Sequence, residues 1–243
     1  MNLIIEQGNT AVKAAVYDRG KIVTTAVYEE FGLSELLPFF EQYPLENGIL
    51  STVAKTDEAW IDCMNRRLKY FLFLDSRSAL PIAIRYQTPE RLGCDRIAVA
   101  AGAHFLCPGR DILVIDAGTA ITYEIVEASG AYVGGNISPG MTTRFRALHQ
   151  FTEKLPLVKQ QDEVPLIGIS TETAIVAGVV NGIVYEMDGY INELRKKYPD
   201  IFVFLTGGHS FYFERRLKNS IFAAINLVLV GLNRILEYNV EKQ

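Results

Sequence analysis

The chain has 243 residues, of which 49% are hydrophobic, and carries a formal charge of −4 with a pI of about 5.5. This length can bury a substantial core as one large or two modest domains, and the acidic balance gives no general attraction to nucleic acid or to an anionic membrane. The three cysteines form no C-x-x-C pair, which argues against a zinc site or a disulfide framework, and no uncharged stretch is long enough to span a membrane. We therefore expect a cytoplasmic protein with no nucleic-acid or membrane partner.

The hydrophobic pattern predicts an α/β protein. In the first half we expect strands at 2–6, 11–17, 21–28 and 48–53, helices at 33–42, 57–70 and 91–106, and a strand-and-loop segment at 71–86. In the second half we expect strands between 111 and 137, helices at about 138–150 and from Ser170 onward, a strand at 201–205 and two closing helices, with 221–232 predicted as buried helix. Pro108 marks the expected boundary between two lobes, 1–108 and 109–243, with no flexible linker between them.

One sequence phrase occurs twice. Residues 3–10 (LIIEQGNT) and 113–120 (LVIDAGTA) each lead from an apolar strand to an acid, then to a glycine two residues on, then to small polar residues. Both copies continue into a second apolar stretch and reach a turn glycine at the same spacing, Gly20 and Gly130. A matched pair of strand–turn–strand units argues for an internal duplication, with two similar lobes facing each other across a nucleotide cleft.

The chemistry of the two turns suits a metal-bound phosphate. Gly8 and Gly118 allow close approach of the backbone and positive φ. Glu6 and Asp116 can hold a cation, or its bound water, against phosphate oxygens. Hydrogen bonds to those oxygens are available from Asn9, Thr10, Thr119 and Thr122.

Together the motifs resemble those of type III pantothenate kinases, a family of the sugar kinase, Hsp70 and actin superfamily. Six segments are similar to the family's patterns, in the expected order: 6–13 (EQGNTAVK), 88–96 (TPERLGCDR), 116–120 (DAGTA), 134–140 (GGNISPG), 170–175 (STETAI) and 206–208 (TGG). The resemblance covers nearly the whole chain. It implies duplicated ribonuclease H-like (actin-like ATPase) lobes, each a mixed sheet flanked by helices, with a nucleotide cleft between them. The implied activity is ATP-dependent phosphorylation of pantothenate to 4'-phosphopantothenate, the first step of coenzyme A biosynthesis.

The resemblance also implies the site, position by position. Asp95 would be the general base. Pantothenate would be bound by Tyr86, Gly93, Cys94, Asp95, Arg96 and Thr171, the last reaching the neighbouring subunit's substrate in a homodimer. ATP with Mg²⁺ would be bound by Glu6, Gln7, Gly8, Asn9, Thr10, Ala11, Val12, Lys13, Thr119, Gly207 and Gly208. A monovalent cation, K⁺ or NH₄⁺, would be bound by Asp116. The apolar segment 174–184, which would need burial, also favours the homodimer.

Elementary chemistry supports the substrate residues, although each has a simpler interpretation. Phosphoryl transfer needs an in-line hydroxyl group, a carboxylate to accept its proton, and cations. Arg96, beside Asp95, can clamp the carboxylate of pantothenate with two hydrogen bonds. Alternatively, Asp95 could only stabilise the N-terminus of its helix. Arg96 could form a salt bridge between the lobes, and Tyr86 could be a half-buried core aromatic residue. Thr171 could belong only to the cap of the helix that starts at Ser170.

Glu6 is the main departure from the family pattern, which has aspartate there. The extra methylene displaces the carboxylate by about one C–C bond length, which disturbs a magnesium site that demands near-ideal octahedral geometry. Either the loop is displaced and Glu6 takes the role of the aspartate, or Glu6 coordinates Mg²⁺ through water and nucleotide binding is weaker. Lys13 could reach a phosphate or be a solvated strand lysine, and Gly207-Gly208 could be only a tight turn.

Two other function classes stay open. Another small-molecule kinase of the same superfamily would share both turns but should lack the G-x-D-R segment with its upstream Tyr86. A non-catalytic regulator would bind nucleotide without turnover; the presence of Asp95 and the acidic balance disfavour it, whereas Glu6 keeps it open. A P-loop kinase is excluded, because the chain has no G-x-x-x-x-G-K-[ST] motif.

Overall fold

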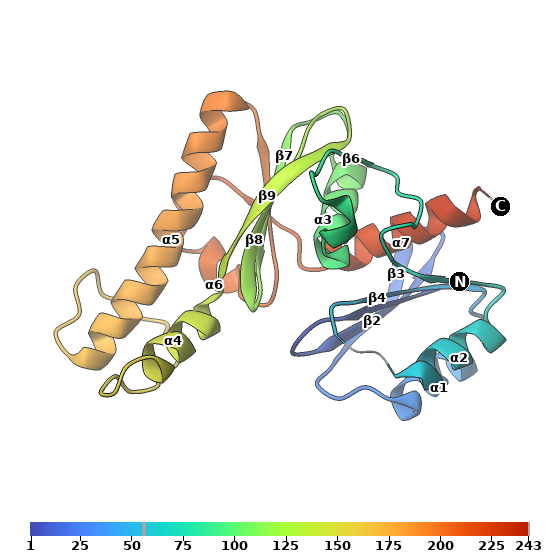
Figure 1. The fold of residues 1–243 in the computed structure, drawn as a ribbon, viewed down its shortest axis with the longest axis horizontal. Helices are drawn as coiled ribbons and strands as arrows, with labels where there is room; N and C mark the ends of the chain where they lie inside the picture. The colour runs from blue at the N-terminus through green and yellow to red at the C-terminus, as the bar shows by residue number, and fades with distance from the viewer. Residues whose placement is uncertain (55–56, 243) are drawn as a thin grey trace. The chain divides into compact units, whose positions relative to one another are not determined.

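The structure is a computed structural model that describes residues 1–54 and 57–242. The chain forms two compact units, which Figure 1 traces in the colours of the sequence. Unit 1 comprises Met1–Gly109, Val126–Val133 and the chain from Asn226 onward, and unit 2 comprises Arg110–Ile125 and Gly134–Ile225. The C-terminal helix is thus grouped with the N-terminal half of the chain. The lobes 1–108 and 109–243, inferred from the sequence duplication, stay a prediction.

Unit 1 is built on a five-stranded sheet of order β3-β2-β1-β4-β5. Its elements are β1 (Asn2–Gln7), β2 (Val12–Asp18), β3 (Lys21–Tyr28), α1 (Leu33–Gln42), β4 (Asn47–Thr52), α2 (Glu58–Arg67), β5 (Tyr70–Phe73), β6 (Ala83–Ile84), the 3₁₀ turn η1 (Pro89–Arg91), α3 (Cys94–Leu106) and α7 (Leu227–Val240). β1, β2 and β3 are antiparallel neighbours, whereas β4 runs parallel to β1 and β5 parallel to β4. The sheet is therefore mixed, as expected.

The two faces of this sheet are covered by different helices, as Figure 1 shows for unit 1. Leu3 and Ile5 of β1 pack against apolar side chains of α1 and α2. Because side chains alternate along a strand, Glu6 lies on the opposite face, the one that α3 and α7 cover. α3 and α7 approach closely where Gly102 meets Gly231: a Cβ on Gly102 would lie 2.6 Å from the carbonyl oxygen of Leu227. This packing places the start of α3 on the Glu6 face of the sheet.

Most of unit 2 is a second sheet and the long helix that covers it. Its elements are β7 (Ile112–Ala117), β8 (Ala120–Val126), β9 (Ala131–Pro139), α4 (Met141–Gln150), α5 (Thr171–Lys197), β10 (Phe202–Thr206), α6 (Ser210–Glu214) and β11 (Phe222–Ala223). The sheet order is β11-β10-β7-β8-β9-β6. The distal ends of β8 and β9, residues 126–133, are grouped with unit 1, as is β6. None of the helices within residues 1–54 and 57–242 is long and apolar enough to cross a membrane.

Local sequence explains the boundaries of α5. Ser170 and Thr173 form a reciprocal capping box at its N-terminus, with Glu172 in the first turn. Its last turn is basic, with Arg195, Lys196 and Lys197, which complements the helix dipole. Between these ends, one face is apolar and joins the core of unit 2. The predicted start of this helix is confirmed.

Three predicted boundaries are wrong. The helix predicted at 57–70 ends at Arg67, and Tyr70 opens strand β5 beside β4. The helix predicted from 91 begins at Cys94, because Pro89 starts a separate 3₁₀ turn. The stretch 221–232 is helical only from Leu227, because β11 pairs with β10 instead. Strand pairing, of β5 with β4 and of β11 with β10, sets the first and the third of these boundaries.

Candidate active site

The two sequence-related turns have a common local geometry. A Cβ added to Gly8 would lie 3.4 Å from Oε1 of Glu6, and a Cβ added to Gly118 would lie 3.4 Å from Oδ1 of Asp116. In each turn the carboxylate of the preceding acid therefore lies close to the glycine two residues on. Close approach of these two glycines to a phosphate ligand, expected from the sequence, stays a prediction.

The expectation of positive φ at these two glycines is wrong. Their N–H groups close the hairpins, donating to the carbonyl oxygens of Ala11 and Ala120, respectively, at 3.0 Å in both cases. Positive φ occurs instead at the later turn glycines, Gly20 (74°) and Gly130 (80°). The two glycine N–H groups are thus already hydrogen-bonded within the turns. Exposed groups such as the side chains of Asn9 and Thr10 must supply contacts to a ligand.

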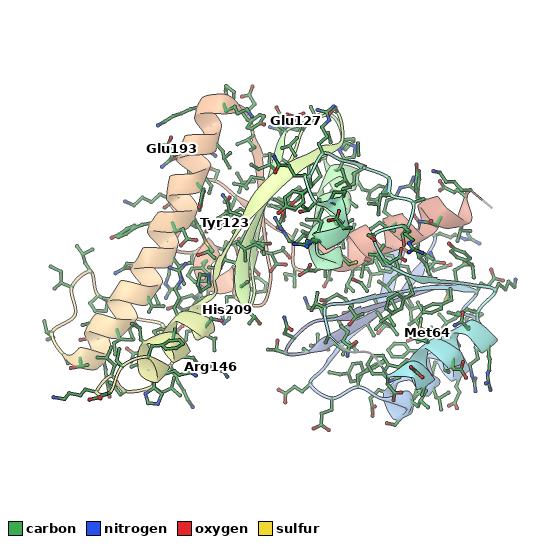
Figure 2. The ribbon with its side chains drawn as sticks, viewed as in Figure 1. Met64, Tyr123, Glu127, Arg146, Glu193 and His209 are labelled. Atoms are coloured by element: carbon green, nitrogen blue, oxygen red, sulfur yellow. The ribbon has the colours of Figure 1, made fainter. Side chains whose placement is uncertain are left out.

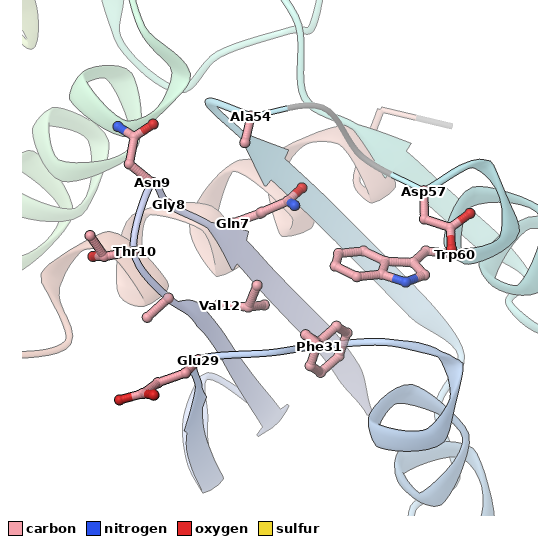
Figure 3. Close-up of a pocket in the computed structure, with 11 residues that line it drawn as sticks. Gln7, Gly8, Asn9, Thr10, Val12, Glu29, Phe31, Ala54, Asp57 and Trp60 are labelled. Carbon is pink, nitrogen blue, oxygen red and sulfur yellow. The ribbon is translucent and has the colours of Figure 1, made fainter.

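A pocket of about 380 Å³ lies beside the first turn, within unit 1 (Figure 3). Its lining combines residues of the predicted phosphate loop with residues that follow β3 and β4: Gln7, Gly8, Asn9, Thr10, Ala11, Val12, Glu29, Phe31, Ala54, Asp57 and Trp60. Trp60 is the only tryptophan in the sequence, is 3% exposed, and meets Phe31 edge-on at 4.9 Å between ring centroids. The sequence analysis did not identify this aromatic pair, because Phe31 and Trp60 belong to no motif.

Glu6 is buried on the other face of the same sheet. It is 9% exposed and lies opposite Lys13 in the β1–β2 pair, with 3.7 Å between Oε2 and the lysine Nζ. Burial raises the pKa of the Glu6 carboxyl group; Lys13 opposes this rise, and the negative charge of Asp95 adds to it. The three predicted residues Glu6, Lys13 and Asp95 are therefore electrostatically linked.

Asp95 lies in the first turn of α3. Its Oδ1 accepts a hydrogen bond from the backbone N–H of Arg96 at 2.8 Å. This oxygen therefore acts as the simpler interpretation expects of an acid at a helix N-terminus. Within the described residues, Oδ2 accepts no hydrogen bond. Gly93 leaves room for this arrangement, since a Cβ there would lie 2.4 Å from Oδ1. One oxygen thus fixes the carboxylate, and the other can accept a proton.

Arg96 lies in an aromatic setting. It is 7% exposed, its guanidinium carbon lies 5.8 Å from the ring centroid of Tyr86, and its Nη2 donates to the hydroxyl group of Tyr132 at 2.9 Å. Tyr86 and Tyr132 meet edge-on with ring centroids 6.0 Å apart. The structure therefore brings Tyr86 and Arg96 together. Tyr132, which the sequence analysis missed, stands only two residues before the Gly134-Gly135 motif.

The predicted unit 2 residues gather around the second turn. Gly207 has φ of 92°, and a Cβ there would lie 2.3 Å from Oδ1 of Asp116, so only glycine fits this close to the carboxylate. The carbonyl oxygen of Thr119 accepts from the backbone N–H of Gly140 at 3.0 Å, while Thr119 and Gly208 are exposed. The G-G-x-I-x-P-G segment thus supports the second turn directly.

A polar network in unit 2 that includes Tyr123, labelled in Figure 2, was also missed by the sequence analysis. Arg144 donates to Glu186 at 2.5 Å and to Ser138 at 2.8 Å, and Tyr123 donates to Glu186 at 2.8 Å. Burial opposes ionisation of Glu186, but these hydrogen bonds and the charge of Arg144 lower its pKa overall. The network ties β8, β9, α4 and α5 together, which fixes the segment around Gly140. The residues of this network are far apart in the sequence, so no sequence motif indicates it.

Thr171, by contrast, is exposed and separate from the cap of α5. The capping hydrogen bonds belong to Ser170 and Thr173, and Thr171 makes no side-chain hydrogen bond within the described residues. Apart from the exposed Ala174, the apolar side chains of segment 174–184 are buried within unit 2, so the argument that they need a partner subunit is wrong. Other side chains are exposed nearby, among them Ile169, at 97%.

Residues 1–54 and 57–242 contain no group of three or more His, Cys, Asp and Glu side chains that could hold a metal ion. Mg²⁺ bound to a nucleotide takes only one or two protein carboxylates, with phosphate oxygens and water completing its shell. A site with Glu6 and few other acids fits that requirement. It does not fit an all-protein metal centre.

Comparison with solved structures identifies the fold as that of the sugar kinases and actin-like ATPases. A ROK family glucokinase from Streptomyces griseus, in complex with glucose and AMPPNP, matches with a TM-score of 0.55 at 12% identity, covering 99% of each chain. A Campylobacter jejuni protein described as a Baf family transcriptional activator matches with a TM-score of 0.62 at 20% identity, covering 98% of this chain and 99% of that one. At such identities the likeness concerns the fold alone. The expected α/β architecture of duplicated ribonuclease H-like lobes is confirmed.

The sequence comparisons are more specific. The model of the type III pantothenate kinase family matches residues 2–193. A type III pantothenate kinase of Phocaeicola vulgatus is 48% identical over 239 residues, covering 98% of this chain and 99% of that protein. One of Cytophaga hutchinsonii is 43% identical over 241 residues, covering 99% and 100%. The chain belongs to the type III pantothenate kinase family.

Proposed function

We propose that this protein transfers the γ-phosphoryl group of ATP to the primary hydroxyl group of pantothenate, with Asp95 as the general base. The product is 4'-phosphopantothenate, and the reaction is the first step of coenzyme A biosynthesis. Family membership over nearly the whole chain supports the reaction. The arrangement at the start of α3, with a fixed Asp95 beside a buried Arg96, is the observation that carries the assignment of residues.

The role of Asp95 follows from the needs of phosphoryl transfer. The attacking hydroxyl group must be positioned in line and must lose its proton, whereas the protein forms no covalent bond. Oδ1 of Asp95 is occupied by the backbone N–H of Arg96, so Oδ2 is the atom that accepts the proton. Gly93 is required because any side chain there would collide with the carboxylate.

Arg96 binds the opposite end of the substrate. Pantothenate carries a carboxylate, and a guanidinium group binds a carboxylate through two parallel hydrogen bonds. Tyr86 lies beside the guanidinium group, and Gly93 and Cys94 form the backbone that leads into Asp95 and Arg96 at the start of α3. A substrate with a hydroxyl group at one end and a carboxylate at the other therefore suits this segment.

ATP binds at the two turns. Residues 6–13 contact its phosphates, Thr119 is a further ATP contact, and the Gly207-Gly208 backbone binds its adenosine part. Mg²⁺ balances the phosphate charge when bound, with Glu6 as the protein carboxylate, directly or through water. The ion pair of Glu6 with Lys13 supports the water-mediated arrangement, because Lys13 already engages one carboxylate oxygen.

Asp116 holds a monovalent cation, K⁺ or NH₄⁺. Its carboxylate lies against the backbone at Gly118 and Gly207, because no side chain separates these glycines from it. One carboxylate with surrounding backbone oxygens gives a site of low charge, which suits a monovalent cation better than a divalent one.

The protein acts as a homodimer in which Thr171 contacts the pantothenate of the partner subunit. The exposed apolar residues before α5 favour an interface there, because large apolar side chains rarely stay exposed together on a monomer. They are Leu166, Ile167 and Ile169. A monomeric mass by light scattering at assay concentration would contradict the homodimer and the role of Thr171 across it.

The deciding experiment is an ADP-release assay with pantothenate, with and without K⁺, on the wild-type protein and on Asp95→Asn. We expect K⁺-stimulated turnover by the wild type and a loss of at least about 10²-fold in kcat for Asp95→Asn. Robust turnover by Asp95→Asn would overturn the base assignment. Nucleotide binding without turnover by the wild type would favour a non-catalytic regulator instead.

A further inference from the structure

The cluster of Tyr86, Arg96 and Tyr132 contains a polar group outside the family motifs, the hydroxyl group of Tyr132. Arg96 Nη2 donates to it at 2.9 Å. Tyr132 is 0% exposed, so this hydroxyl group is a fixed acceptor rather than a mobile surface group. One of the five N–H donors of Arg96 is therefore committed to a rigid partner.

The backbone of Tyr132 is equally well anchored. Its strand pairs in parallel with β6, with Tyr132 opposite Ile84, and its carbonyl oxygen accepts from the N–H of Arg85 at 2.8 Å. Tyr86 follows one residue later and meets the Tyr132 ring edge-on. Tyr132 thus fixes the segment that carries Tyr86 through its backbone and fixes Arg96 through its side chain.

This double anchoring matters for the chemistry of Arg96. Two-point binding of a carboxylate requires the plane of the guanidinium group to be aligned with the plane of the carboxylate. An arginine side chain has many rotamers, and each must be restricted before the pair can form. A hydrogen bond donated by one Nη atom restricts both the side-chain rotamer and the rotation of the guanidinium plane.

We propose that Tyr132 is a positioning residue for the carboxylate of the substrate, with its hydroxyl group holding the Arg96 guanidinium group in the orientation that binds pantothenate. This inference rests on the proposed role of Arg96 and extends it. It predicts a specific defect: loss of the Tyr132 hydroxyl group weakens recognition of the carboxylate and leaves the nucleotide site and the phosphoryl-transfer chemistry unchanged.

The test is Tyr132→Phe, which keeps the ring and removes only the hydroxyl group. Kinetics are measured with pantothenate and with pantothenyl alcohol, in which a hydroxymethyl group replaces the carboxylate. We expect KM for pantothenate to rise about 10-fold, the size expected for a lost hydrogen bond to a charged group. KM for ATP, and kcat/KM for pantothenyl alcohol, stay at the wild-type values. The ratio of kcat/KM for the two substrates does not depend on the fraction of folded enzyme, so partial unfolding cannot imitate this result.

The matched control is Tyr212→Phe. Tyr212 is also buried, and its hydroxyl group also donates to a neighbour, the carbonyl oxygen of Gln161, outside the predicted site. A general effect of losing a buried tyrosine hydroxyl group would appear in this variant as well. We expect its selectivity between the two substrates to match that of the wild type.

A double-mutant cycle with Arg96→Gln separates the possible failures. If Tyr132 acts through Arg96, Tyr132→Phe has no further effect on selectivity in the Arg96→Gln background. Loss of selectivity in Arg96→Gln but not in Tyr132→Phe would overturn the role of Tyr132 alone. Unchanged selectivity in Arg96→Gln would overturn the role of Arg96, and with it this inference.

Discussion

Gly93→Ala tests the geometry of the proposed base most directly. The added Cβ would lie 2.4 Å from Oδ1 of Asp95, whereas ordinary van der Waals contact begins at about 3.4 Å. The carboxylate must therefore move by about 1 Å, the difference between these two distances. The nearest group is the end of a flexible side chain, so the chain can fold around the change. The substitution displaces the base and keeps its chemistry.

The size of the effect follows from this displacement. A misplacement of about 1 Å at a reacting group can cost about 10²-fold in rate. That factor corresponds to about 2.7 kcal/mol in the activation free energy. The hydrogen bond from the Arg96 N–H to Oδ1 is also disturbed, which loosens the carboxylate further. We expect kcat to fall about 100-fold, with little change in KM for ATP.

The assay is steady-state ADP release, accompanied by thermal melting of each variant. Gly189→Ala is the control, because a Cβ there meets nothing within 4 Å on a helix surface. It should keep wild-type kinetics and gain about 0.5–1 kcal/mol of stability, as alanine does over glycine within a helix. A Gly93→Ala enzyme with wild-type kcat and an unchanged melting temperature would refute the claim that the position of the Asp95 carboxylate sets the rate.

Three further predictions concern the two turns. The folded-state pKa of Glu6 lies above its ordinary value of 4.5, so ionisation of this group destabilises the fold as the pH rises through the folded-state pKa. Glu6→Gln should therefore raise the melting temperature at neutral pH, and this gain should vanish as the pH falls to 4.5. A gain that is independent of pH would contradict this prediction. Trp60 lines the pocket beside the predicted phosphate loop, so ATP bound in that pocket should change its fluorescence saturably, and a spectrum unaffected by saturating ATP would place the nucleotide outside this pocket. Asp116→Asn should abolish stimulation by K⁺, whereas stimulation equal to that of the wild type would rule out Asp116 as the cation ligand.

Much of the architecture was predictable because local patterns decide it. The apolar runs of β1 and β2 and the capping pair of Ser170 and Thr173 act over a few residues, and the predicted strands and helix start are confirmed. Errors occurred where a distant partner decides the outcome. The residues 221–226 have an apolar pattern compatible with a helix, but the neighbouring strand β10 pairs with part of that stretch. A backbone that pairs with another strand cannot also form helical hydrogen bonds.

The candidate site divides in the same way. The motifs identified the chemical groups at Glu6, Asp95 and Arg96, because the chemistry of phosphoryl transfer and carboxylate binding restricts which residue types can serve. They could not reveal how those groups are held. Burial raises the pKa of Glu6, and burial depends on the helices that cover its face of the sheet.

The sequence by itself therefore determined the family, the reaction class and the order of the motifs, because each motif is a short run of residues whose chemistry can be read locally. The tertiary structure alone decided which side chains support them. Tyr132 is 36 residues from Arg96 along the chain, yet its hydroxyl group accepts a hydrogen bond from that arginine, and its strand β9 pairs with β6, which precedes Tyr86. Contacts of this kind depend on how strands and helices pack, which no local pattern encodes.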